Sequence, residues 1–424
     1  MTSGNSPKLL DKNIIIPFVL ITSCFAWWGL ANNMTDTLLA AFKKIKSMSD
    51  FQTSLIQMAF YGAYFCFAIP AALFIKRFSY KSGILLGLAL FICGGLLFYP
   101  ASITQEYWHF LVALYILAGG LSILETSANP YILEIGDKRT ATQRLNLAQS
   151  FNPLGSITGV LISMYFILPG LRDLSKSDRL AMSSEDLLAV QTEELSAIMG
   201  PYVVVSFVLI IVWILIASVK MPKSKDSHQV HVLQSFRRLL SNSDYLLGVV
   251  AQFFYVGAQI CVWSFTIRYV MQELDINESD ASAYYLAAIV TFSSSRFLGT
   301  WLLSYFRPTY LLISFTIIAG LSTLVVVFFG GLVSVIFLIA ISMGMSIMFP
   351  TIFGMATNTI STEDMKIAGS GMIMAIVGGA VLTPIQGLVS DSSGISSSYL
   401  VPFICFVVIL LFAINHLKSN TKTA

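Results

Sequence analysis

The sequence predicts an all-α membrane protein with twelve transmembrane helices in two six-helix bundles. The first observation is composition: 56% of the 424 residues are hydrophobic, only 11% are charged, and the mean hydropathy is +0.77. A soluble domain carries roughly a quarter charged residues. So few charges cannot cover a water-exposed surface of this size, which excludes a soluble enzyme, a nucleic-acid-binding protein and a disordered chain.

The second observation is a series of twelve apolar runs. A helix needs roughly 20 mostly apolar residues to cross the hydrocarbon core. The first run is long for a signal peptide and has no small-residue cleavage site, so we expect it to be retained. The predicted spans are 13–42, 52–75, 83–102, 108–135, 146–169, 200–219, 244–272, 282–304, 309–329, 332–356, 368–390 and 397–416.

The third observation is the longest inner loop, which divides the chain as six plus six. We expect an N-terminal bundle at 1–219, a cytoplasmic linker at 220–243 and a C-terminal bundle at 244–424. A short repeat supports the division: Gly120-Leu-Ser-Ile-Leu precedes Glu125 in the fourth span, and Gly344-Met-Ser-Ile-Met precedes Phe349 in the tenth. The N-terminal copy thus carries a carboxylate where the C-terminal copy carries a phenyl ring.

The distribution of lysine and arginine predicts the orientation. With both termini in the cytoplasm, the inner segments hold 17 of these residues and the outer segments hold 7. This bias follows the positive-inside rule, although a cluster at 43–46 falls on the outer side. The basic linker is better explained by topology than by a binding site. Residues 170–199 form an acidic outer segment whose leucine spacing suggests a short amphipathic surface helix.

Several kinds of chemistry are excluded by what the chain lacks. The five cysteines lie in apolar runs without a CxxC pair, and the four histidines are scattered, so we expect no disulfide framework, metal site or cofactor. A net charge of +3 argues against nucleic acid as a partner. The chain has no GxxxxGK[ST] loop for ATP, which excludes a primary pump. We expect a monomer.

Three ionisable residues lie well inside the predicted helices: Asp36, Glu125 and Arg296. A charge at the bilayer centre costs at least roughly 2.5–3.5 kcal/mol on insertion scales. Such residues usually face a partner or a water-filled space. Arg296 has two interpretations of equal weight, a role in function or an anchor that pins its helix to a carbonyl or an acid.

Amide, carboxylate and indole side chains form stripes on four predicted helices. Amides donate and accept hydrogen bonds and an indole stacks on apolar C–H groups, so the set suits a neutral sugar. The alternative is helix–helix bonding, to which intramembrane amides contribute about 0.6–2 kcal/mol. We favour a pocket for the set and leave single amides open. The stripes comprise Trp28, Asn32, Asn33 and Asp36; Ser122, Glu125 and Asn129; Asn146, Gln149 and Asn152; and Gln252, Tyr255, Gln259 and Trp263.

Prolines interrupt the spans near this inferred pocket, at Pro130, Pro153, Pro350 and Pro384. Each removes a backbone hydrogen bond, and the freed carbonyls can line a watery cavity. For each single proline, an ordinary packing kink is the better explanation. Buried carboxylates can take up a proton on one side of a membrane and release it on the other. We therefore expect proton coupling through Glu125, with Asp36 as a nearby acid, and leave sodium coupling open.

The motifs around these residues resemble the fucose–proton symporter family of the major facilitator superfamily. The resemblance covers about residues 13–415. The matching stretches are Trp28-Gly-Leu-Ala-Asn32-Asn33-Met-Thr-Asp36, Leu124-Glu125-Thr-Ser-Ala-Asn129-Pro130, Arg144-Leu-Asn146-Leu-Ala-Gln149-Ser-Phe-Asn152, Ala251-Gln252-Phe-Phe-Tyr255-Val-Gly-Ala-Gln259, Trp263-Ser-Phe-Thr-Ile-Arg268-Tyr269 and Arg296-Phe-Leu-Gly299-Thr300-Trp301.

The resemblance implies the major facilitator fold and import of a monosaccharide, L-fucose first, by alternating access in a bacterial inner membrane. It implies that Asp36 and Glu125 serve proton coupling and that Asn33 and Gln149 bind the sugar beside Trp28 and Trp263. Phe349 departs from the family, which has a tyrosine there. Another hexose or an N-acetylhexosamine is the nearest alternative. A multidrug–proton antiporter and a membrane sugar sensor are the rivals from other classes.

Overall fold

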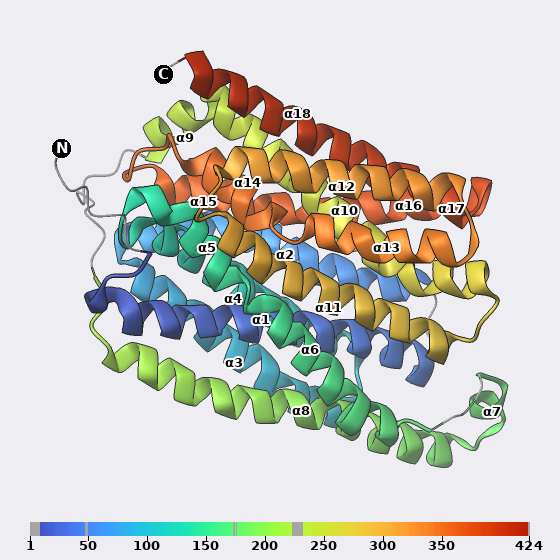
Figure 1. The fold of residues 1–424 in the computed structure, drawn as a ribbon. Coiled ribbons are helices and arrows are strands. Elements are labelled where there is room, and N and C mark those ends of the chain that lie inside the picture. The colour runs from blue at the N-terminus through green and yellow to red at the C-terminus, as the bar shows by residue number, and fades with distance from the viewer. Residues whose placement is uncertain (1–8, 47–49, 173, 175, 223–231, 423–424) are drawn as a thin grey trace. The chain divides into compact units, whose positions relative to one another are not determined.

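The computed structural model describes residues 9–46, 50–172, 174, 176–222 and 232–422. It describes only the backbone for 35–44, 50–55, 57–58, 168, 176–177, 180, 232, 278–279 and 419–422. The described residues form helices and contain no strand, as Figure 1 shows. The α-helices are α1 (Ile15–Ile45), α2 (Asp50–Arg77), α3 (Tyr80–Thr104), α4 (Tyr107–Glu134), α5 (Ala141–Gln149), α6 (Asn152–Ile162), α7 (Lys176–Ala181), α8 (Ser184–Ser218), α9 (Val232–Leu240), α10 (Ser243–Leu274), α11 (Glu278–Leu302), α12 (Pro308–Phe328), α13 (Gly331–Met345), α14 (Met348–Thr357), α15 (Met365–Met374), α16 (Gly378–Ser393), α17 (Ile395–Ser398) and α18 (Leu400–Lys422).

Each predicted span corresponds to one helix or to two consecutive helices, which confirms the all-α fold class. The fifth span is α5 with α6, the tenth is α13 with α14, and the eleventh is α15 with α16. Among the described residues, eleven helical segments are long and apolar enough to cross a membrane. The remaining predicted span is α11, whose mean hydropathy is lowered by Arg296 and the serines at 293–295.

The expected short helix within 170–199 is present as α7, at Lys176–Ala181. Residues 184–199 are the first part of α8, which continues to Ser218. Its start is fixed by Ser183, whose hydroxyl accepts the Asp186 backbone N–H at 3.1 Å. Glu194 within this segment is fully buried and ion-paired, so its carboxylate is stabilised by the protein and not by water.

The Arg179–Glu194 pair anchors the start of α8 to α7. Two guanidinium nitrogens donate to the carboxylate at 2.7 and 2.8 Å, and the Arg172 backbone N–H donates to it at 3.0 Å. The Arg179 and Glu194 side chains are 3% and 0% exposed. A bidentate pair with a further donor meets the geometry that a buried ion pair requires.

The chain divides into two compact units, each described by itself. One unit holds Ile16–Ala128 and Leu154–Met221. Within it, α3 lies directly against α4, because a Cβ added to Gly94 would stand 2.5 Å from the Leu117 backbone nitrogen, and one added to Gly87 would stand 2.8 Å from the Gly120 carbonyl oxygen. Such close backbone contact through small residues is typical of helices packed in membranes.

The other unit holds Met1–Ile15, Asn129–Pro153 and Pro222–Ala424. Here α10 packs against α11, α14, α16 and α18. The stretch 129–153, which the predicted six-plus-six division assigns to the N-terminal bundle, packs in this unit against α11 and α14. The predicted division of the chain therefore remains a proposal.

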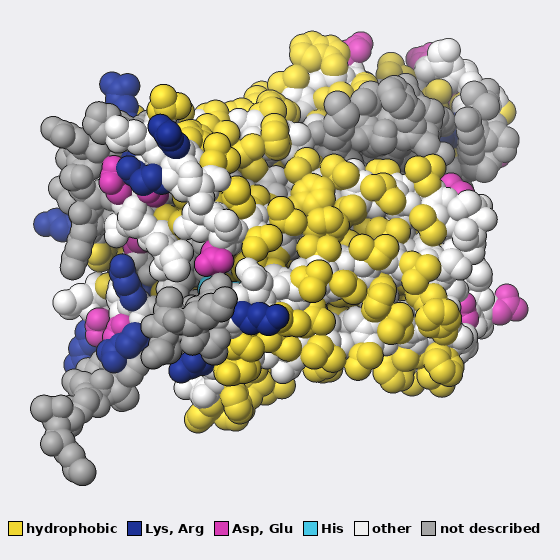
Figure 2. Space-filling model, turned by 90° about the horizontal axis from the view of Figure 1, so that it is seen from above, with side chains coloured by type: hydrophobic (Ala, Val, Ile, Leu, Met, Phe, Trp, Pro, Cys, Tyr) yellow, Lys and Arg dark blue, Asp and Glu magenta, His cyan; other side chains and the backbone are white. Residues whose placement is uncertain are grey.

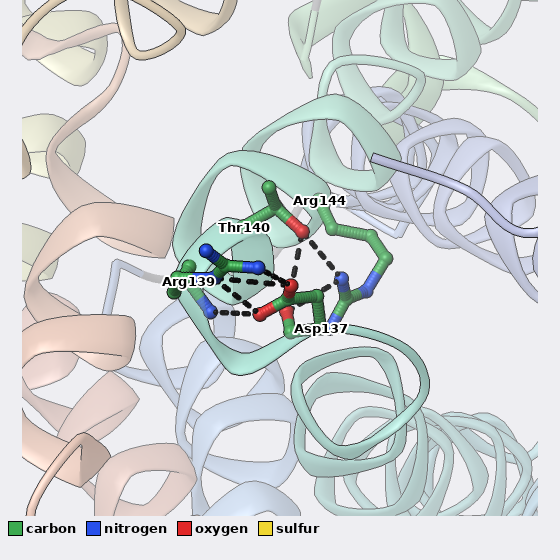
Figure 3. A network of polar contacts seen from close by, with 4 residues as sticks. All are labelled: Asp137, Arg139, Thr140 and Arg144. Atoms are coloured by element: carbon green, nitrogen blue, oxygen red, sulfur yellow. Dashed lines mark hydrogen bonds and ion pairs between the residues drawn. The ribbon is translucent and has the colours of Figure 1, made fainter. Parts of the chain in front are cut away.

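Arg144 closes the C-terminal end of α4 in the second unit, and Figure 3 shows its contact with Thr140 in the turn that follows. Its guanidinium donates to the carbonyl oxygens of Ile132 and Leu133 at 2.9 and 3.0 Å and to the Thr140 hydroxyl at 3.0 Å. The last carbonyls of a helix have no intrahelical partner, and a cation near them is favourable. Arg144 is fully buried, so it orders the turn between α4 and α5 rather than contributing a surface charge.

The exposed surface is apolar along the helices, as a lipid-facing surface should be. In α8, the side chains of Val204, Phe207, Ile211 and Ile214 are 55–62% exposed and follow the helical repeat. Figure 2 shows hydrophobic side chains across the middle of the face in view, with lysine and arginine gathered toward one end. This pattern fits a chain surrounded by hydrocarbon rather than by water.

Replacing Arg179 with methionine should lower the free energy of unfolding by about 3–5 kcal/mol, because Glu194 would be left buried without its cation. Thermal unfolding of the purified protein in detergent measures the change. The exposed Arg172–Glu193 pair supplies the control: Glu193→Gln should change stability by less than about 1 kcal/mol. Equal melting temperatures for the two variants would show that the buried pair contributes no more than a surface pair.

Candidate functional site

Glu125 lies in the middle of α4, in the first unit, and its side chain is buried. Its carboxylate interacts with Tyr64 of α2 and Trp28 of α1. The Trp28 indole N–H donates to the Tyr64 hydroxyl. An indole nitrogen can only donate, so the Tyr64 oxygen accepts and its own proton remains available for an acceptor such as the carboxylate. Three helices thus converge on one acid.

The surroundings of Glu125 fix α1, α2 and α4 relative to one another. The Ser122 hydroxyl, one turn before Glu125, donates to the Tyr64 carbonyl oxygen at 3.1 Å. Tyr64 is 1% exposed, so this contact is shielded from solvent. The side chain of Ser122 is therefore bound to α2. A hydrogen-bonded acid on rigid helices can keep one orientation while its protonation changes.

The polar stripe of α1 is described only in part. Asn32 and Asn33 are half-buried, and the Asn32 carbonyl oxygen of the side chain is buried without a partner among the described residues. A Cβ added to Gly159 would lie 3.0 Å from the Asn33 Cβ, so α6 packs closely on α1 at this point. The Asp36 side chain lies outside the described residues, and its predicted role stays a prediction.

In the second unit, three of the predicted amides come together at the end of α5. The Gln149 side chain donates to the Asn129 side-chain oxygen at 2.8 Å. The Asn146 side chain donates to the Thr351 hydroxyl of α14 at 3.2 Å and to the Thr142 carbonyl at 2.9 Å. Asn129, Asn146 and Gln149 are all buried. Part of this set therefore bonds helix to helix, as the alternative interpretation of the amides requires.

The predicted stripe on α10 divides into a buried and a half-buried part. Gln252 and Tyr255 are fully buried, whereas Gln259 and Trp263 are half-buried. The Trp263 indole donates to the Ser342 hydroxyl at 3.3 Å. The Tyr255 and Phe349 rings pack edge to face at a centroid distance of 6.2 Å, which places the phenyl ring of the tenth span beside α10.

Several buried polar atoms of the second unit have no protein partner among the described residues. They are both amide atoms of Gln252, the side-chain oxygen of Asn146 and the Ser346 hydroxyl. Leaving such a group unsatisfied costs about 1–3 kcal/mol. Buried polar groups in native proteins are normally hydrogen-bonded to protein, water or ligand. These atoms favour the interpretation of this region as a binding site for a polar molecule, with Gln252 as its clearest member.

Arg296 of α11 binds main-chain carbonyls. Its guanidinium donates to the carbonyl oxygens of Ser346 and, at 3.0 Å, of Gln149, and it lies over the Phe292 ring at 4.5 Å. None of the ion pairs within the described residues includes Arg296. Of the two interpretations of Arg296, the structure supports an anchor to carbonyls.

The sequence reasoning missed Tyr64 and Thr351, which contact Trp28 and Asn146. A signal for Tyr64 was present: Tyr61 and Tyr64 place two hydroxyls on one face of an apolar helix. A buried tyrosine hydroxyl usually has a hydrogen-bond partner. Thr351 offered no comparable signal, because threonine is common in membrane helices and bonds its own backbone.

Comparison with known proteins gives the same architecture. A family model described as Major Facilitator Superfamily matches residues 18–375. An L-fucose-proton symporter of Haemophilus influenzae is 42% identical over 97% of this chain and 99% of its own length. A glucose/galactose transporter of Brucella abortus is 31% identical over 96% of both chains. The crystal structure of the E. coli fucose:proton symporter FucP matches with a TM-score of 0.88 and 38% identity, covering 96% of this chain and 99% of that one.

Proposed function

Because this chain belongs to the major facilitator superfamily, we propose that it is a proton-coupled symporter that imports a neutral monosaccharide, L-fucose in the first place, by alternating access. The 42% identity with a fucose-proton symporter across nearly the whole chain supports this substrate and this coupling ion. The observation that carries the proposal is the buried Glu125 carboxylate held between Tyr64 and Trp28.

This arrangement suits reversible protonation. A charged carboxylate is costly in an apolar interior, so the protein changes between its two states most easily when the Glu125 carboxyl group is neutral. The Tyr64 hydroxyl, which accepts the Trp28 indole N–H and keeps its own proton to donate, stabilises the charged form when the proton leaves. Glu125 can therefore exist in both states at one place, as a coupling residue must. Asp36 is proposed as the second acid from its place on α1.

The sugar site is proposed on amide, indole and phenyl side chains. Its residues are Trp28, Asn33, Asn129, Asn146, Gln149, Gln252, Gln259, Trp263 and Phe349. The buried amide of Gln252, with both atoms unsatisfied, supports a hydroxyl-rich ligand. Phe349 places an apolar ring there, which suits a deoxy sugar with a methyl group. Because a relative is a glucose/galactose transporter, another hexose is the alternative substrate. Competition by unlabelled sugars in the uptake assay decides between L-fucose and another hexose.

The orientation and location are also proposals. We place the chain in a bacterial inner membrane, as a monomer in lipid, with both termini in the cytoplasm, because lysine and arginine are in excess on that side. Lys81 at this end of α3 donates to the carbonyl oxygens of Ala217 and Val219 at 2.7 and 2.8 Å. A cation bound to the last carbonyls of a helix is favourable at a membrane surface.

Alternating access predicts contacts that form in one state and break in the other. Residues 141–150 contact α11 and α14 through polar groups: the Gln143 side chain donates to the Thr300 carbonyl at 3.4 Å, and the Ser150 and Thr300 hydroxyls lie 3.3 Å apart. If the six-plus-six division holds, these contacts join the two bundles. We propose that they open once in each transport cycle.

Replacing Glu125 with glutamine should abolish concentrative uptake of radiolabelled fucose into proteoliposomes with an imposed gradient, while exchange without a gradient continues. One charge moving down 100 mV gains ~2.3 kcal/mol, which can drive about 50-fold accumulation of a neutral sugar, and the variant should lose this accumulation. Glu134→Gln, at the water-accessible end of the same helix, is the matched control and should accumulate sugar normally. Undiminished accumulation by Glu125→Gln would refute the coupling role of this acid.

Adding fucose to lightly buffered, energy-depleted cells that express the protein should raise the external pH, because each sugar enters with a proton. A pH electrode records the change, and a protonophore should remove it. Cells with the empty vector provide the baseline. Robust uptake with a constant pH would instead indicate sodium coupling or facilitated diffusion.

A disulfide between positions 142 and 354 should stop transport reversibly. A Cβ added to Gly354 would stand 3.2 Å from the Thr142 Cβ, close to the usual ~3.5–4.5 Å of a disulfide. We expect the Thr142→Cys, Gly354→Cys variant to lose more than about 90% of exchange on oxidation and to regain it on reduction. The single variants control for the substitutions and for the native cysteines. A cross-linked protein that transports at the reduced rate would contradict opening at this contact.

A further inference from the structure

Two helix breaks in the second unit are each associated with a proline. The ring nitrogen of proline cannot donate, so the carbonyl four residues earlier loses its helical partner. Pro153 leaves the Gln149 carbonyl oxygen without a helical donor, and Pro350 leaves that of Ser346. These are the places where α5 gives way to α6 and α13 gives way to α14.

The Arg296 guanidinium binds these same two oxygens. Its Nε donates to the Ser346 carbonyl, and its Nη1 donates to the Gln149 carbonyl at 3.0 Å. One side chain thus supplies a donor for each N–H that the two prolines lack. A guanidinium suits this task, because its donors point in fixed, divergent directions, whereas a lysine ammonium is a single point.

The remaining contacts of the region explain how a cation is held there. Arg296 is 3% exposed, and its charge is met by carbonyl dipoles and by the face of the Phe292 ring at 4.5 Å. The Tyr255 hydroxyl donates to the neighbouring Met345 carbonyl at 3.2 Å. The broken turn of the tenth span is therefore bound from two sides, by α10 and by α11.

Both breaks carry proposed sugar-site residues. The side chain of Gln149 donates to Asn129, while its carbonyl is held by Arg296. Phe349 directly precedes Pro350 and packs on Tyr255. We infer that Arg296 is a positioning residue that substitutes for the two missing N–H groups and so sets the placement of Gln149 and Phe349 in the sugar site. The effect on sugar binding rests on the proposed function, whereas the contacts of Arg296 with the two carbonyls do not.

Two substitutions test the inference: Arg296→Lys weakens the bonds to the two carbonyls, and Pro350→Ala returns one of the missing backbone N–H donors. Arg296→Lys should raise the fucose concentration for half-maximal exchange by at least about tenfold, since the donors of an ammonium sit on one nitrogen and do not span the two carbonyls that the guanidinium fork reaches. The pH dependence of exchange should keep its shape, because Glu125 is untouched. Adding Pro350→Ala restores an N–H for the Ser346 carbonyl, so the double variant should recover at least about threefold of that loss.

Arg268→Lys is the matched control, because Arg268 also lies over a phenyl ring, that of Phe265 at 4.2 Å, but is exposed. It should leave half-saturation unchanged, alone or with Pro350→Ala. Thermal unfolding without sugar gives a readout that does not depend on transport: Pro350→Ala should raise the melting temperature of Arg296→Lys and not that of Arg268→Lys.

The outcomes separate the two hypotheses. A wild-type protein that binds no fucose refutes the proposed substrate, while the melting temperatures still test whether Arg296 replaces the two missing N–H groups. If Arg296→Lys does not accumulate as folded protein, rescue of its accumulation by Pro350→Ala supports the inference and absence of rescue overturns it. Equal effects of Pro350→Ala in the Arg296→Lys and Arg268→Lys backgrounds also overturn it.

Discussion

The constraint on which the structure depends is that a polar group inside a membrane protein must find its partner within the protein or its ligand. Hydrocarbon supplies no donors or acceptors, and each unsatisfied group costs several kcal/mol. Most backbone groups meet the constraint through long helices. The informative residues are those that meet it in another way, and three buried arginines show how: Arg144 at a helix end, Arg179 on a carboxylate, and Arg296 on interrupted turns.

These three arginines stabilise different parts of the chain, and only one lies beside proposed sugar-site residues. Arg144 completes the end of α4, and Arg179 holds the start of α8. Arg296 is next to the Gln149 and Phe349 positions, where prolines break the helices that carry them. Irregular backbone in a membrane protein is tolerated where it is buried in protein or lines a water-filled cavity. The interrupted turns bound by Arg296 are buried in protein, which is the first of these conditions. They also carry proposed sugar-site residues, which agrees with the second.

The proposed chemistry uses two sets of residues, which share Trp28. Glu125, Tyr64 and Trp28 form a small donor–acceptor chain around one acid in the first unit. Amides and aromatic rings dominate the second, in which both amide atoms of Gln252 lack a protein partner among the described residues.

The sequence by itself determined the fold class, the approximate spans and the identity of the residues that had to be explained, because hydropathy and buried charge are properties of local sequence. It could not decide which amides bond to neighbouring helices and which remain unsatisfied, since that depends on contacts between distant segments. The tertiary structure placed Tyr64 beside Glu125, paired Gln149 with Asn129, began α8 as early as Ser184, and brought two proline-interrupted turns to a single arginine. Hydrogen bonds reach only about 3 Å, so such partnerships are fixed by packing and have no signature along the chain.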